Sequence, residues 1–153
     1  MAKHNSIPLP RKIPTTPQRS RIMSAIYGRG NKSTEVRLIK IMRWHHITGW
    51  RRDWPLPGKP DFVFPKYRLA VFVDGCFWHG CPRCYTEPRK NTEYWREKIR
   101  RNTLRDRRNV RLLRTKGWHA MRLWEHALKN DIIVANRIKK AIGKHEGRRE
   151  DRL

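Results

Sequence analysis

Long hydrophobic runs are missing from this chain of 153 residues. No stretch approaches the roughly 20 apolar residues that a membrane-spanning helix needs. No hydrophobic segment of the secretory type follows Met1. Hydrophobic residues make up 37% of the sequence, which is enough for one modest core but thin for two. We therefore expect a soluble, cytosolic protein with one compact domain.

Acidic side chains are also scarce. The chain has 13 Asp and Glu residues against 37 Lys and Arg residues, which gives a formal net charge of +24. Charge of one sign on this scale opposes compaction, and phosphate contacts by Lys and Arg release condensed counterions. An anionic membrane and a merely basic soluble surface are the other interpretations, but the composition favours a nucleic-acid partner.

Cysteines are few and lie close together, at Cys76, Cys81 and Cys84. An odd number at such short spacing in a cytosolic protein favours a metal site over disulfides. A tetrahedral zinc site needs a fourth ligand, and His79 and His126 are the candidates. We choose His126, because a ligand that follows a distant strand would staple the loop to the core. Three buried structural thiols are the alternative.

The composition changes at both ends of the chain. Residues 1–18 are rich in proline and basic residues and predict a flexible cationic arm. Residues 144–153 predict a charged, frayed tail. The part between them, residues 19–143, is expected to form a single domain, and no internal repeat is present.

Hydrophobic spacing and turn residues predict an α/β domain with a mixed sheet. The expected elements are helices at residues 19–27, 35–47, 92–116 and 132–142, and strands at residues 61–64, 67–73 and 118–124. Ser33 is the expected cap of the second helix, and Gly117 and Gly143 are the expected ends of the last two. The first two strands predict a hairpin that turns at residues 65–66, and the third would return by a helical crossover.

Two acids flank the predicted hairpin. Asp61 begins the first strand and Asp74 follows the second, so the two would lie near each other at one edge. Paired carboxylates can hold a hydrated Mg²⁺ against a phosphodiester. His79 lies just beyond and is a candidate general acid or base, because imidazole titrates near neutral pH. A strand-end Asp that caps a turn is the ordinary alternative.

Several segments together resemble one known family. They are 56–63 (LPGKPDFV), 74–82 (DGCFWHGCP), 93–99 (EYWREKI), Asn102, 105–108 (RDRR), 117–118 (GW) and 124–128 (WEHAL). In this order they closely resemble the very-short-patch repair (Vsr) endonucleases, over residues from about 19 to 128. The resemblance implies a restriction-endonuclease-like PD-(D/E)XK fold. It also implies Mg²⁺-dependent nicking of one DNA strand 5′ to the thymine of a G·T mispair, which arises by deamination of 5-methylcytosine.

The resemblance also implies roles for individual residues. Asp61 matches an essential metal-binding aspartate, and Val73 falls where a backbone carbonyl is a second Mg²⁺ ligand. His79 matches a histidine that assists catalysis, and Glu35 a glutamate near the scissile phosphate. Asp74 departs from the family, whose best-known members carry a second histidine there, so its part in handling the proton or the attacking water stays open.

The resemblance implies DNA-wedging and zinc-binding positions as well. Phe77 and Trp78 match aromatic residues that enter the DNA from the major groove, and Met23 a residue that enters opposite from the minor groove. The matching zinc positions are Cys76, Cys81, Cys84 and His126. Here Cys81 replaces a histidine and His126 replaces a cysteine, which are conservative exchanges for zinc. Cys84 departs from the family by lying one residue further on than the equivalent ligand.

Other interpretations stay open beside this one. Phe77 and Trp78 could be core aromatics instead of a wedge. Trp95 and Trp118 are expected in the core, and Asp106 is expected to be an ion-pair partner on the arginine-rich helix. A restriction- or mobile-element-associated nuclease, or a non-catalytic zinc-knuckle nucleic-acid-binding protein, are the alternative functions. The expected partner is duplex DNA with a G·T mismatch, bound by a nucleoid-associated prokaryotic monomer, with accessory mismatch-repair proteins possible.

Overall fold

The computed structural model of the chain describes residues 16–18, 21 and 34–150, with side chains described as far as residue 144. Some of the expected features fall outside these residues. They are most of the arm at 1–18, most of the helix at 19–27, Met23, the cap at Ser33, and the last three residues of the tail.

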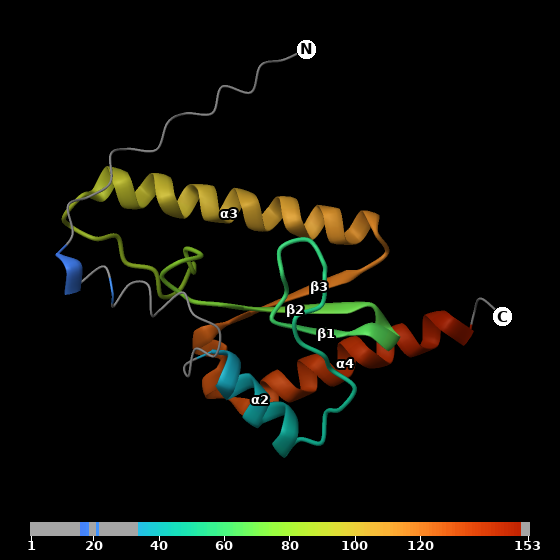
Figure 1. Cartoon of the computed structure of the whole chain (residues 1–153). Helices are drawn as coiled ribbons and strands as arrows, with labels where there is room; N and C mark the ends of the chain where they lie inside the picture. The colour runs from blue at the N-terminus through green and yellow to red at the C-terminus, as the bar shows by residue number, and fades with distance from the viewer. Residues whose placement is uncertain (1–15, 19–20, 22–33, 151–153) are drawn as a thin grey trace, which may run out of the picture.

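A three-stranded mixed sheet forms the centre of the domain (Figure 1). Its strands are β1 (Phe62–Phe64), β2 (Leu69–Asp74) and β3 (His119–Trp124), in the order β1-β2-β3. Strand β1 pairs antiparallel with β2, and β3 pairs parallel with β2. The predicted hairpin and the return of a third strand by a crossover are therefore confirmed.

The hairpin turn is longer than expected. Pro65 starts a short 3-10 helix, η1 (Pro65–Tyr67), and Arg68 follows in the left-handed conformation at φ 48°. Strand β2 therefore begins at Leu69, and the expectation that it begins at residue 67 is wrong. The fixed φ of proline favours this tight helical turn over a two-residue loop.

The crossover from β2 to β3 contains the longest helix, α3 (Thr92–Thr115). Its end is at the expected place, since Gly117 adopts φ +74° and Trp118 leads into β3. Asn91, with φ 53°, precedes the helix. The second and third predicted helices and the third predicted strand thus lie close to where the sequence placed them.

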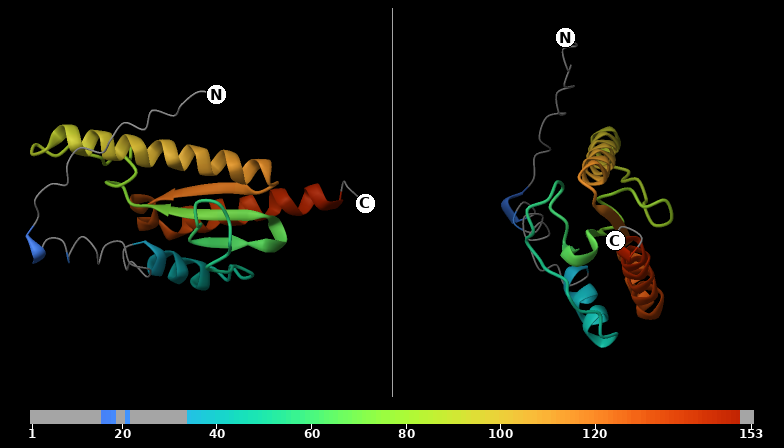
Figure 2. Two further views of the ribbon diagram at one scale, coloured as in Figure 1. Left: turned by 45° about the horizontal axis from the view of Figure 1, so that its top comes forward. Right: turned by 90° about the vertical axis from the view of Figure 1, so that its right-hand side faces the viewer.

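The two faces of the sheet are covered by different helices (Figure 2). Helices α2 (Glu35–Trp44) and α4 (Asp131–Glu150) cover one face, and α3 covers the other. The larger core cluster lies on the α2 and α4 side and includes Phe62, Phe64, Leu69, Val71 and Leu123. The smaller cluster lies on the α3 side and contains Val63, Ala70, Phe72 and Leu113. Alternation along each strand sends neighbouring residues to opposite faces.

Helix α2 differs from its prediction in length and in its buried face. It ends at Trp44 and not at residue 47, because His46 adopts a left-handed φ of 54°. Its buried residues are Leu38, Ile41 and Met42. The sequence spacing of Val36, Ile39 and Met42 predicts a stripe along those three positions, but only Met42 of the three is buried.

Helix α4 continues through the predicted stop at Gly143 as far as Glu150. The predicted end at residue 142 is therefore wrong, and residues 144–150 belong to the helix. Gly143 has no left-handed φ and open space around it, so nothing there ends the helix. Glycine in a helix interior costs only about 1 kcal/mol relative to alanine. Within the described residues, no helix is long and apolar enough to cross a membrane.

Candidate active site and metal centre

Parallel pairing of β2 and β3 brings together two loops that are distant in the sequence. Both strands end at the same edge of the sheet, because Asp74 pairs with Trp124. The loop after β2, residues 75–91, carries the three cysteines. The segment after β3 is a short 3-10 helix, η2 (Glu125–Lys129), which carries His126. One edge of the sheet therefore gathers most of the predicted functional residues.

The four predicted zinc ligands converge at this edge. The ligand atoms of Cys76, Cys81, Cys84 and His126 all lie within 4.8 Å of one another. The Sγ atoms of Cys76 and Cys84 are each 3.3 Å from His126 Nδ1, and that of Cys81 is 3.5 Å away. The choice of His126 over His79 as the fourth member of the cluster agrees with this geometry.

The donor set suits a metal ion. Three thiols and one imidazole form a Cys3His set, which is typical of tetrahedral structural zinc sites. Burial is the largest influence on the pKa of Cys76 and raises it to about 11. Burial also acts to raise the pKa of Cys81, but the backbone amides of Arg83 and Cys84 lower it overall. A cation held here would favour the thiolate forms and bind all four side chains at once.

Asp61 lies immediately before β1 and beside the end of β2. Its Oδ2 accepts a hydrogen bond from the backbone N–H of Val73 at 2.7 Å. The pKa of Asp61 is raised from 3.8 to about 6, mainly by burial; the backbone bond from Val73 and the charge of Arg52 act to lower it, and the charges of Glu35 and Asp74 act to raise it. The surroundings of Asp61 therefore disfavour its ionised form, and a bound divalent cation would stabilise that form.

Glu35 faces this position from the first turn of α2. Its Oε2 accepts a hydrogen bond from Arg52, in the loop that leads to β1. The Arg52 guanidinium also lies 5.6 Å from the centre of the Phe62 ring, and its buried Nε has no hydrogen-bond partner among the described residues. The structure therefore brings Glu35 close enough to Asp61 to influence its pKa, as the predicted roles of both residues require.

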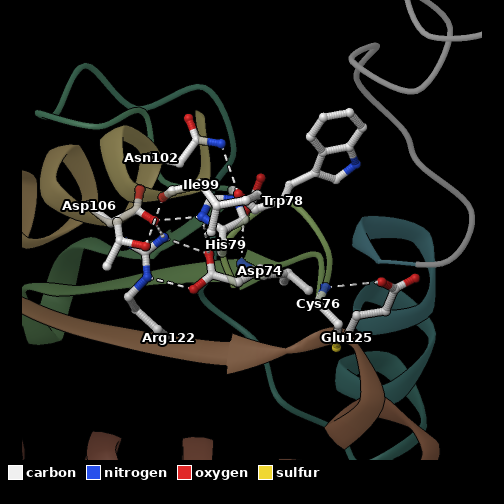
Figure 3. Close-up of polar contacts among 12 residues, drawn as sticks. Asp74, Cys76, Trp78, His79, Ile99, Asn102, Asp106, Arg122 and Glu125 are labelled. Carbon is white, nitrogen blue, oxygen red and sulfur yellow. Dashed lines mark hydrogen bonds and ion pairs between the residues drawn. The ribbon is translucent and has the colours of Figure 1, made fainter. Parts of the chain in front are cut away.

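Asp74 and His79 belong to a network on the α3 side of the sheet (Figure 3). Both oxygens of Asp74 accept hydrogen bonds from Arg122, each at 2.6 Å. His79 Nδ1 lies 2.5 Å from Asp106 Oδ2 and 3.9 Å from Asp74 Oδ1. The expected ion-pair character of Asp106 is confirmed, and its partners are His79 and Arg122.

One face of α3 holds the loop that carries His79. Asn102 Nδ2 donates to the backbone oxygen of Trp78 at 2.8 Å, and Asp106 contacts His79 one turn further on. Gly80, at φ +63°, packs so tightly that an added Cβ would lie 2.7 Å from Ile99 Cγ2. The Cys3His cluster and α3 therefore hold the loop from two sides.

Five aromatic side chains form an aromatic cluster beside this loop: Phe77, Trp78, Tyr85, Tyr94 and Trp95. All five are half-buried, and Lys98 Nζ lies 5.6 to 5.8 Å from the centres of the Trp78, Tyr94 and Trp95 rings. The expectation that Trp95 lies in the core is therefore wrong. The start of α3 packs on the 75–91 loop, away from the sheet. Trp118, in contrast, packs against the smaller core cluster as predicted.

Two arginines of the site, Arg52 and Arg122, were not singled out by the sequence. Arg122 lies in a strand between Met121 and Leu123, and a charged residue inside an apolar strand needs a partner. That pattern was a usable signal, but it does not identify the partner. Arg52 stands in a loop among other basic residues, where no local pattern separates it from them.

Comparison with known proteins gives consistent matches. A family model described as DNA mismatch endonuclease Vsr matches residues 12–85. The chain is 41% identical over 113 residues to the DNA mismatch endonuclease Vsr of Escherichia coli (strain K12), which covers 72% of this chain and 71% of that protein. It is 35% identical over 136 residues to the Type II nicking enzyme V.NmeDIP of Neisseria meningitidis serogroup C, which covers 87% and 91%. It is 47% identical over 77 residues to the Type II nicking enzyme V.NaeI of Lentzea aerocolonigenes, which covers 50% and 46%.

Proposed function

Because this chain belongs to the Vsr family of DNA mismatch endonucleases, we propose that it nicks one DNA strand 5′ to the thymine of a G·T mispair, in a Mg²⁺-dependent reaction. Membership makes the chain a DNA endonuclease that hydrolyses phosphodiester bonds. The mispair, the strand and the metal are the further content of the proposal. So is the assignment of the mixed α/β sheet to the restriction-endonuclease-like PD-(D/E)XK fold.

The contact between Asp61 and Val73 supports this proposal most directly. A carboxylate and a strand-end backbone segment meet within 2.7 Å at the sheet edge. The Asp61 carboxylate and the Val73 carbonyl would hold a hydrated Mg²⁺, which keeps several waters and needs few protein ligands. Such an ion polarises the scissile phosphate and activates a bound water. Glu35, held by Arg52, would contribute to the charge balance near the same phosphate.

His79 is the residue that we assign to proton transfer. Asp106 engages its Nδ1, so Nε2 is the ring nitrogen that remains to exchange a proton with the attacking water or the leaving oxygen. Asp74 is tied to Arg122 and serves this arrangement as a neighbouring charge. The Cys3His cluster, for which zinc is the fitting ion, holds the loop that carries His79.

A direct comparison of substrates tests the function. With Mg²⁺, a duplex with one G·T mispair should be nicked at least about 100-fold faster than the matched G·C and A·T duplexes. A difference of a few kcal/mol in unstacking supports this factor, since 1.4 kcal/mol is tenfold. Gel analysis of end-labelled strands would map the cut. Equal cutting of matched DNA would favour a restriction- or mobile-element-associated nuclease, and binding without cutting would favour the zinc-knuckle alternative.

Phe77 and Trp78 are the proposed wedge at the mispair. They lie side by side with ring centres 5.1 Å apart and are only half-buried. Lys98 lies over the Trp78 ring, where its ammonium group can contact a DNA phosphate. Apolar wedges unstack a base step at a cost of a few kcal/mol, which is smallest at a mismatch. Discrimination would then rest partly on how readily the G·T step deforms.

Trp78→Ala should therefore lose much more G·T nicking than non-specific DNA affinity, by a factor of about ten or more. Fluorescence of 2-aminopurine next to the mispair would report unstacking, and Trp44→Ala, which removes a tryptophan that is 78% exposed on α2, is the matched control. A Trp78→Ala variant that unstacks the probe like the wild type, or that fails to fold, would make Trp78 a structural residue.

A further inference from the structure

Arg122 lies at the centre of the network on the α3 side of the sheet, between two carboxylates (Figure 3). It stands opposite Phe72 in the parallel β2–β3 pair, and its guanidinium lies 4.7 Å from the centre of the Phe72 ring. Its Nε and one terminal nitrogen bind both oxygens of Asp74 at 2.6 Å. The terminal nitrogen is also 3.3 Å from Asp106 Oδ2. One side chain thus joins the central strand to helix α3.

Both oxygens of the Asp74 carboxylate take part in the contact with Arg122. Asp74 is 3% exposed and accepts a bidentate pair of hydrogen bonds, which is the strongest arrangement for an Arg–carboxylate pair. Asp61, just before the neighbouring strand, accepts a backbone hydrogen bond and forms no such forked pair with any described residue. The two acids that the sequence places together therefore have different surroundings. Asp61 is available to a cation, and the charge of Asp74 is balanced by Arg122.

Arg122 also influences His79 through Asp106. The Asp106 oxygen that contacts Arg122 is the one that contacts His79 Nδ1. Asp74 Oδ1 is 3.9 Å from the same ring nitrogen, so two carboxylates flank one imidazole. Two negative charges this close repel each other in a partly buried site. The guanidinium between them offsets that repulsion and keeps Asp106 in contact with the ring.

We propose that Arg122 is a positioning residue for the nicking reaction. It holds Asp74 as a counter-ion, away from the metal, and it fixes Asp106 so that His79 presents Nε2 to the reacting atoms. This rests on the proposed function only for the role of His79. The alternative is that Arg122 merely stabilises the packing of β3, and a second alternative is that Asp74 is itself a metal ligand.

Four variants separate these possibilities: Arg122→Met, Asp74→Asn/Arg122→Met, Asp74→Asn alone, and Arg100→Met as the control. Arg122→Met removes the guanidinium but keeps much of the side-chain volume, and it leaves Asp74 buried without a partner, so the melting temperature should fall. Asp74→Asn/Arg122→Met removes the unpaired charge and should recover most of that stability. Arg100→Met removes the same charge from an exposed ion pair with Glu97 on α3 and is the matched control.

The expected result is a loss of turnover that does not follow stability. In Arg122→Met, kcat on the G·T duplex should fall about 10- to 100-fold, as for other residues that orient a functional side chain, with KM within about threefold of wild type. The double variant should regain its melting temperature but not its kcat. A double variant that regains both would make Arg122 only structural. Asp74→Asn with the same loss as Asp61→Asn would make Asp74 a metal ligand and overturn the proposal.

A spectroscopic measurement tests the positioning without any cleavage assay. In ¹⁵N–¹H NMR spectra of the wild-type protein, the His79 ring N–H that is bonded to Asp106 should give a strongly downfield proton signal. Arg122→Met should weaken or shift that signal, and Arg100→Met should not. An unchanged His79 signal in Arg122→Met would overturn the proposal. If Arg122→Met changes the His79 signal as predicted but the wild-type protein nicks no G·T duplex, the result would instead contradict the proposed function.

Discussion

Replacing Asp61 with asparagine should lower the nicking rate by at least about a thousandfold, while the affinity for DNA stays within a few-fold of the wild-type value. The carboxylate is the one negatively charged group proposed to bind the catalytic cation directly. The DNA affinity comes from the basic surface, since the formal net charge is +24. Single-turnover nicking and a binding isotherm at fixed salt, measured on the same preparation, would separate the two effects.

The stability of this variant gives an independent check. Burial raises the pKa of Asp61 from 3.8 to about 6, so the folded state binds this proton more tightly than the unfolded state does. The ionised group therefore opposes folding, and its unfavourable contribution grows as the pH rises from 3.8 to about 6. Asparagine does not ionise. At pH 7 without divalent metal, Asp61→Asn should melt at the same temperature as the wild type or higher.

Asp131→Asn is the matched control for this experiment. It makes the same chemical change at the start of α4, where Asp131 contacts His45. That variant should keep its nicking rate. Normal cleavage by Asp61→Asn would show that Asp61 is not part of the active site. A low melting temperature of this variant would show that its activity is lost through misfolding.

Loss of the proposed zinc ion should destabilise the protein by far more than the loss of side-chain packing alone. Cys84 is exposed, so replacing it with alanine costs little packing energy. Cys84 is one of the four proposed ligands to a structural zinc, and losing such a ligand is expected to cost several kcal/mol. For a domain of this size each kcal/mol shifts the melting temperature by roughly 2–4 °C. We therefore expect Cys84→Ala to melt about 10 °C lower than the wild type.

Metal analysis and chelation complete the test. The wild type should contain about one zinc per chain, and a strong chelator should reproduce the effect of Cys84→Ala. His119→Ala, at the exposed start of β3, is the control for removing a histidine outside the cluster. A protein without zinc whose three thiols all react freely in the native state would sink the hypothesis.

Local patterns predicted the elements that local patterns determine. The hairpin, the crossover helix with its stop at Gly117 and the third strand follow from strand alternation, turn residues and helix signals. The end of α4 did not follow, because Gly143 stops a helix only when it adopts a left-handed φ. The chain continues as a helix there, so the glycine at position 143 does not end helix α4.

The site divides in the same way. Side chains that share a loop, such as the three cysteines, could be grouped from their spacing, and His126 could be added because it follows a strand. The pairing of Asp74 with Arg122 could not, since it depends on the register of a parallel strand 48 residues away. Trp95 was assigned to the core because an apolar position on a helix does not reveal which neighbour will cover it.

The parallel pairing of β2 and β3 also bears on how the chain finds its fold. The partners Cys76 and His126 are 50 residues apart, and the whole crossover lies between them. Parallel strands joined by a long connection form slowly, because the loop must close before its contacts are made. An ion shared by the two ends would close that loop early. For a cross-link over this span, the entropy removed from the unfolded chain corresponds to about 4 kcal/mol. The metal centre would then cross-link the two ends of the β2–β3 connection, in addition to supporting the loop locally.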